Sequence, residues 1–187
     1  WGSGRSGPQP VVDANSTPIA DATQLSVSLP TVGQATADSA CAAFSSGRAM
    51  CWGHNDSGQL GNPSNTATDV AAALTVTDPN STPLEQVKQV GVGAQHACAL
   101  LTTGAVVCWG RRDRLGNGSS GTAAQRSFVP VRGIDDALEL AVGSNHGCVR
   151  RATGQVQCWG DNAKGQLGVD PATTVSSLVP VNVTGLP

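Results

Sequence analysis

Six cysteines are the residues of this chain with the most evident chemistry, and they form three pairs of identical spacing. The two members of each pair lie ten positions apart: Cys41 and Cys51, Cys98 and Cys108, Cys148 and Cys158. Cysteines can form disulfides, bind a metal as thiolates, or stay reduced as small apolar side chains. The even number and the repeated spacing favour disulfides in an oxidising compartment.

The sequence around the cysteines also repeats. Trp-Gly occurs four times, with Trp spacings of 51, 57 and 50, and the last three are Cys-Trp-Gly. A Gly-Gln-Leu-Gly element follows at 58–61 and 165–168 and is shortened to Arg-Leu-Gly at 114–116. One supersecondary unit is therefore used several times. Its copies span residues 1–51, 52–108, 109–158 and 159–187, the last of them incomplete, within a single domain of residues 1–187.

Residues 98–108 show which element positions a cysteine pair. The two cysteines are symmetric about a three-residue turn, Thr102–Gly104, whose third residue is the glycine that a left-handed turn position favours. Residues opposed on antiparallel strands have Cβ atoms about 4.5–5.5 Å apart, close to disulfide distance. We therefore predict three cross-strand disulfides. Six buried free thiols are the alternative.

Zinc is a further alternative for the cysteines of the last two pairs, because His96 and His146 lie two residues before a cysteine. The spacing differs from the usual Cys-x(2–4)-Cys zinc knuckle, so we predict no metal site. We expect each histidine to make a hydrogen bond at the start of its strand. The tryptophans occupy one repeat position, which favours packing anchors over a ligand platform.

The strands flanking the predicted turn are apolar on both faces, which is typical of a sheet covered on both sides. The chain contains 23 Gly and 11 Pro and is rich in Ala, Ser, Thr and Val, a composition that favours short strands and turns. One hairpin and one or two more strands per repeat fit a propeller blade. We predict an all-β fold, a partial β-propeller of about three to four four-stranded blades.

These motifs resemble the repeat of the regulator of chromosome condensation family. The resemblance rests on Gly93–Leu100 (Gly-Ala-Gln-His-Ala-Cys-Ala-Leu), on Gly104–Gly110 and on Asn162–Gly168. It implies a propeller whose complete members have seven blades, so that further blades or a partner protein would complete the ring. The doubled cysteines look like the bacterial, exported branch of the family. The first unit departs from the pattern with Ser39 in place of His, and the second lacks two residues before Leu115.

The charge and hydropathy of the chain limit the classes of partner that we expect. A net charge of −2 gives no basic face for nucleic acid, so we expect no nucleic-acid partner. No apolar stretch approaches the ~18 residues of a membrane span, although a position peripheral to a membrane complex stays open. Because the chain starts at Trp1 without an initiator Met, we expect a processed product or a piece of a longer protein.

The residues that commonly catalyse reactions are not arranged for catalysis. His54 is a lone loop histidine, and the sequence has no Gly-x-Ser-x-Gly elbow, phosphate-binding loop or His-Glu-x-x-His motif. We therefore predict no catalytic residue, no cofactor and no enzyme activity. Arg111, Arg112 and Arg114 form a basic cluster that is either a solvated loop or a contact for an acidic partner.

The sequence thus favours a non-catalytic scaffold that binds protein or builds a larger assembly. Its expected location is secreted, on the cell surface or in the periplasm of a bacterium. A carbohydrate-binding propeller is the alternative function. Nucleotide exchange on a small GTPase, or chromatin contact, is the third hypothesis. This third hypothesis transfers the activity of the eukaryotic branch of the family to this chain on the resemblance of the fold alone. The acidic composition of the chain argues against it.

Overall fold

The computed structural model describes residues 9–28, 38–66 and 68–185, and these residues form twelve strands and one 3-10 turn. The strands make three antiparallel sheets of four, which we call blades 1, 2 and 3. Blade 1 consists of β1 (Ala22–Val27), β2 (Ser39–Phe44), β3 (Ala49–His54) and β4 (Asp69–Thr75). Blade 2 consists of β5 (Val87–Val92), β6 (His96–Leu101), β7 (Val106–Arg111) and β8 (Ala124–Pro130). Blade 3 consists of β9 (Ala137–Val142), β10 (His146–Arg151), β11 (Val156–Asp161) and β12 (Ser176–Asn182).

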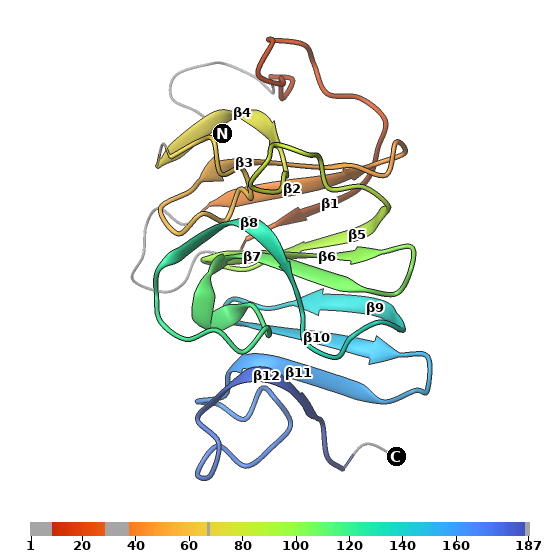
Figure 1. Cartoon of the computed structure of the whole chain (residues 1–187), viewed down its shortest axis with the longest axis vertical. Coiled ribbons are helices and arrows are strands. Elements are labelled where there is room, and N and C mark those ends of the chain that lie inside the picture. Colours follow the sequence, from red (N-terminus) through yellow and green to blue (C-terminus); the bar gives the residue numbers. More distant parts are fainter. Residues whose placement is uncertain (1–8, 29–37, 67, 186–187) are drawn as a thin grey trace.

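The blades stack face against face in chain order, with blade 2 between the other two (Figure 1). Within each blade the strands pair in the order of the sequence, so the first strand lies at one edge of its sheet. The first strand β5 of blade 2 contacts both β1 of blade 1 and β9 of blade 3. The blades therefore converge at this edge, as the blades of a propeller do around an axis.

Each blade has the predicted hairpin between its second and third strands. In blade 2, the Gly104 N–H donates to the Leu101 carbonyl and Gly104 has a φ of +89°. The corresponding glycines of the other two hairpins, Gly47 and Gly154, have φ values of +78° and +86°. The three-residue turns ending in a left-handed glycine are thus confirmed.

Two linker segments, 13–18 and 78–83, share the sequence Asp-x-Asn-Ser-Thr-Pro and form the same turn. Asp78 Oδ1 accepts hydrogen bonds from the main-chain N–H groups of Asn80 and Thr82, each over 2.8 Å. Asp13 makes the same two bonds in the segment that precedes blade 1. In both segments the Asp carboxylate closes the turn by bonding main-chain N–H groups that follow it in the sequence. The turns precede β1 and β5, the first strands of blades 1 and 2.

The all-β partial propeller of three to four four-stranded blades is confirmed by this architecture. The sheets are out of phase with the repeat units, because a unit that begins at a Trp begins within the third strand of a blade. The two residues missing from the second unit coincide with the 3-10 turn η1 (Arg112–Arg114), which shortens the loop after β7. In the described part of the chain, no helix has the length and apolar character needed to cross a membrane.

Candidate functional site

The three predicted disulfides are present, one in each blade. Each joins directly opposed residues of the second and third strands, with Cα atoms 4.0–4.1 Å apart. Because every cysteine sulfur is bonded to another cysteine sulfur, none is a thiolate that could bind zinc. Among the described residues, no three His, Cys, Asp or Glu side chains gather so that they could hold a metal ion.

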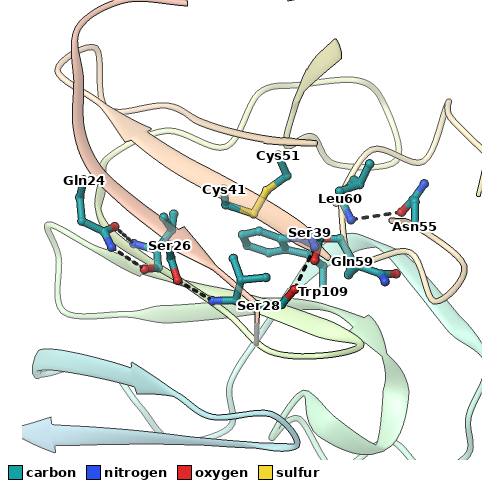
Figure 2. The surroundings of a disulfide bond; sticks show 12 residues. Gln24, Ser26, Ser28, Ser39, Cys41, Cys51, Asn55, Gln59, Leu60 and Trp109 are labelled. Atoms are coloured by element: carbon teal, nitrogen blue, oxygen red, sulfur yellow. Dashed lines mark hydrogen bonds between the residues drawn. A yellow bond between two sulfur atoms is a disulfide. The ribbon is translucent and has the colours of Figure 1, made fainter. Parts of the chain in front are cut away.

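Each of the first two disulfides lies at a junction between blades, beside the tryptophan of the next blade. Figure 2 shows the Trp109 ring of blade 2 next to the Cys41–Cys51 bond of blade 1, and all three residues belong to one buried cluster. Trp159 of blade 3 shares a second cluster with the Cys98–Cys108 bond. The tryptophans are fully buried there, so the prediction of packing anchors is confirmed for Trp109 and Trp159.

The indole of each buried tryptophan is also bonded to the preceding blade. Trp109 Nε1–H donates to the main-chain oxygen of Gln59 over 2.8 Å, and Trp159 Nε1–H donates to that of Arg114 over 3.2 Å. A Cβ added to Gly61 would lie 2.8 Å from the Trp109 ring. The Gly-Gln-Leu-Gly element is therefore a receptor for the next tryptophan, and its last glycine leaves room for the ring.

Two glutamines connect the first strands of adjacent blades. Gln24 accepts the Val90 N–H over 2.7 Å and donates to the Val90 carbonyl over 3.0 Å. Gln89 makes the same pair of bonds with Leu140, over 3.2 and 2.7 Å. A glutamine amide carries a donating NH2 group and an accepting oxygen, so it can bond the N–H and the carbonyl of one edge-strand residue as another strand would.

Blade 3 departs from this pattern at the glutamine position. Glu139 stands where blades 1 and 2 have Gln24 and Gln89, and its carboxylate bonds the guanidinium of Arg150 over 2.7 Å. Hydrogen bonding and charge attraction from Arg150 lower the pKa of Glu139. The face of blade 3 that points away from blade 2 thus carries a solvated ion pair, where the corresponding faces of blades 1 and 2 carry a glutamine that caps the next blade.

His96, at the start of β6, is a buried packing residue. His96 is fully buried, and neither of its ring nitrogens has a hydrogen-bond partner, so the hydrogen bond expected at its strand start is wrong. Burial, with the nearby charge of Arg114 and His146, lowers the pKa of His96 to about 3, so the ring is neutral. A Cβ on Gly93 would lie 2.5 Å from the ring, which explains the Gly-x-x-His spacing.

The basic cluster of blade 2 is largely engaged within its own loop. The Arg111 guanidinium donates to both carboxylate oxygens of Asp113 over 2.8 and 2.9 Å, and Arg114 lies 3.6 Å from the same carboxylate. Arg112 is exposed. A contact of all three arginines with a partner stays a prediction, and Arg112 is the most accessible of them.

Two models of the regulator of chromosome condensation (RCC1) repeat match the sequence. One matches residues 46–100 and 153–187, and the other matches 87–116 and 139–166. Human WBSCR16 has a similar structure, with a TM-score of 0.68 and 19% identity over 88% of this chain and 40% of that one. Yeast RCC1 (Prp20), solved bound to Kap60, has a TM-score of 0.68 and 15% identity over 88% of this chain and 37% of that one.

A second structure of Prp20p from Saccharomyces cerevisiae has a TM-score of 0.64 at 17% identity, over 79% of this chain and 36% of that one. The chain therefore spans 36–40% of the length of these three structures. Among curated proteins, none matches the sequence significantly.

The stacked four-stranded blades, with tryptophan and glutamine joining each blade to the next, define a β-propeller assembled from sequence repeats. The chain belongs to the regulator of chromosome condensation repeat family, whose models together match most of the sequence from residue 46 onward.

Proposed function

We propose that this chain is part of a non-catalytic protein-binding scaffold that works in an oxidising compartment. The observation that carries the proposal is one disulfide in each blade, with no free cysteine among the described residues. Structural disulfides persist outside the reducing cytosol, at the cell surface, in a periplasm or in secretions. A bacterial, exported protein fits this chemistry.

The absence of a catalytic role is supported by the structural work that the polar side chains do. His96 is a buried neutral ring, Arg111 bonds Asp113, and Gln24 and Gln89 cap neighbouring strands. Arg114 lies at ion-pair distance from Asp113. A general acid or base needs a reachable group with a pKa near the working pH. None of these groups offers one, and His54, whose pKa lies above the ordinary value, is engaged with Asp69 and Asp56.

The outer face of β1 is the surface that we propose a partner covers. Leu25 and Val27 are 60% and 56% exposed, whereas the corresponding residues of blade 2, Val90 and Val92, are 1% and 5% exposed. In blade 2 the covering element is blade 1. We propose that a further four-stranded blade covers Leu25 and Val27 in the same way, supplied by the rest of a longer chain or by a partner protein.

Relatives of this fold offer a precedent for protein binding. The yeast relative was solved bound to Kap60, and a second study of it concerns binding to Gsp1p and histones. At 15–17% identity this likeness concerns the fold, so nucleotide exchange and chromatin contact are not part of the proposal. The carbohydrate-binding alternative needs exposed aromatic rings, and the burial of Trp109 and Trp159 argues against it.

The test is affinity capture with the purified protein under non-reducing conditions, followed by intact-mass analysis of what binds. We expect Leu25→Lys with Val27→Lys to abolish capture of a propeller-blade protein, because two charges would be buried at the contact. Val175→Lys, at a residue 63% exposed in the loop before β12, is the matched control and should leave capture unchanged.

Other outcomes of this experiment separate the alternatives. Capture that survives the two lysines and fails with Arg112→Glu would move the contact to the basic cluster and overturn the β1 surface. Binding to a glycan array without any protein partner would replace the scaffold with a lectin.

A further inference from the structure

The residue after Trp-Gly ties the end of the third strand to the following loop in every blade. In blade 2 this residue is Arg111, whose guanidinium bonds Asp113. In blade 3 it is Asp161, which accepts a hydrogen bond from Gln166 over 2.8 Å. Blade 1 has His54 at this position, a side chain whose charge changes near neutral pH.

His54 lies between two carboxylates. Its Nδ1 is 3.0 Å from Asp69 Oδ1, at the start of β4, and its Nε2 is 3.3 Å from Asp56 Oδ2, in the loop after β3. A neutral imidazole has one N–H and can donate to one carboxylate only, whereas an imidazolium donates to both. The observed contacts therefore match the protonated ring.

We propose that His54 is a pH-operated clasp that holds the loop of residues 55–61 to the start of β4 when protonated and releases one carboxylate when it loses its proton. This inference does not depend on the proposed function, since it concerns contacts within blade 1 and at its junction with blade 2. The corresponding Arg111 of blade 2 is a fixed cation, so the device is particular to blade 1.

The groups around His54 come from four elements. Asp69 belongs to β4 and Asp56 to the loop, while the main-chain oxygen of Asp38, just before β2, accepts the main-chain N–H of His54. From blade 2, the Arg126 guanidinium donates to the Asn55 carbonyl over 3.3 Å. Burial lowers the pKa of His54, but the hydrogen bonds and charges of Asp69 and Asp56 raise it more, so that its pKa lies above the ordinary value.

The loop that the clasp holds is the receptor of the blade 1–blade 2 junction. Asn55 Oδ1 accepts the Leu60 N–H over 3.1 Å, and the main-chain oxygen of Gln59 accepts the Trp109 indole N–H (Figure 2). Gln59 also donates to Asp56, one of the two carboxylates of the clasp, over 3.4 Å. The contact with Asp56, at 3.3 Å, is the longer of the two, so we expect a neutral ring to keep Asp69 and release Asp56. That release would loosen the loop at the residues that receive Trp109.

The sign of the effect follows from the raised pKa. A histidine with a higher pKa in the folded state stabilises the fold fully below its unfolded-state pKa, about 6.5, and this stabilisation is lost as the pH rises through the folded-state pKa. His96 and His146 have lowered pKa values, so His54 is the histidine whose loss of a proton changes the stability above pH 6.5.

The test combines an NMR titration of the histidine rings with amide hydrogen exchange of Leu60, corrected for the intrinsic pH dependence of exchange. We expect His54 to titrate above pH 6.5 and Asp69→Asn to move that titration to lower pH. The corrected exchange of Leu60 should be about two- to five-fold faster above the titration than below it, which is the range expected of a partly exposed ion pair.

The matched control is His54→Arg, which puts the fixed cation of blade 2 into blade 1 and should remove the pH dependence of Leu60 exchange. Two results would overturn the clasp. One is titration of His54 at or below pH 6.5 in the unmodified protein. The other is an equal pH dependence of Leu60 exchange in the His54→Arg variant.

Discussion

The indole N–H of Trp109 in blade 2 donates to the main-chain oxygen of Gln59 in blade 1 over 2.8 Å, and the same relation joins Trp159 to Arg114 one blade further on. Blade 2 thus supplies an acceptor to blade 3 and a tryptophan to blade 1. Adjacent blades are held together because one repeat unit carries both the tryptophan and the acceptor loop that such junctions need.

Truncation of Trp109 is expected to be among the most damaging single changes. Trp109→Ala removes a fully buried ring and leaves the Gln59 carbonyl without its donor, so we expect a loss of about 3–5 kcal/mol in the free energy of unfolding. Denaturant unfolding would measure it. If Trp109→Ala is too unstable to purify, Trp109→Phe keeps a ring and tests the lost bond. Trp52, which is partly exposed, is the control position, and an equal loss there would contradict the junction.

The glutamine caps give a second prediction. Gln89→Glu keeps the size of the side chain but loses the N–H that donates to the Leu140 carbonyl, and brings a charged oxygen towards that carbonyl. We expect a loss of about 1–3 kcal/mol at pH 7. Glu139→Gln, the reverse change at the corresponding exposed position of blade 3, should leave the denaturation midpoint nearly unchanged. Equal midpoints for Gln89→Glu and the unmodified protein would show that the cap does not stabilise the fold.

Much of the blade could be predicted from sequence because its signals are local. The turn Thr102–Gly104 and the cysteines on either side of it fix the register of one hairpin within eleven residues. The Gln24 cap could not be predicted in this way, since Val90 is 66 positions away and the bond depends on how two blades pack. His54 looked isolated for the same reason: Asp69 becomes its neighbour only when β4 pairs with β3.

The three disulfides should differ in their accessibility to reductant. The four cysteines of the disulfides in blades 1 and 2 are fully buried, whereas Cys148 in blade 3 is partly exposed. Thiol–disulfide exchange needs access of the attacking thiolate to a sulfur. We expect limited dithiothreitol treatment of the native protein, followed by alkylation and peptide mass analysis, to label Cys148 and Cys158 first. Simultaneous labelling of all six cysteines would indicate that the blade junctions do not shield the other bonds.

A pair of glycines in corresponding hairpins separates backbone strain from packing at the blade junction. Gly104 and Gly154 have nearly equal φ values, +89° and +86°, so Ala at either position costs about 1–2 kcal/mol for the left-handed conformation. A Cβ at Gly104 would also lie 2.7 Å from the Asp135 main-chain oxygen of the next linker, whereas nothing lies within 4 Å of one at Gly154. Gly104→Ala should therefore lower the thermal unfolding temperature clearly more than Gly154→Ala. Equal shifts for the two variants would mean that the hairpin of blade 2 does not press against the chain leading into blade 3.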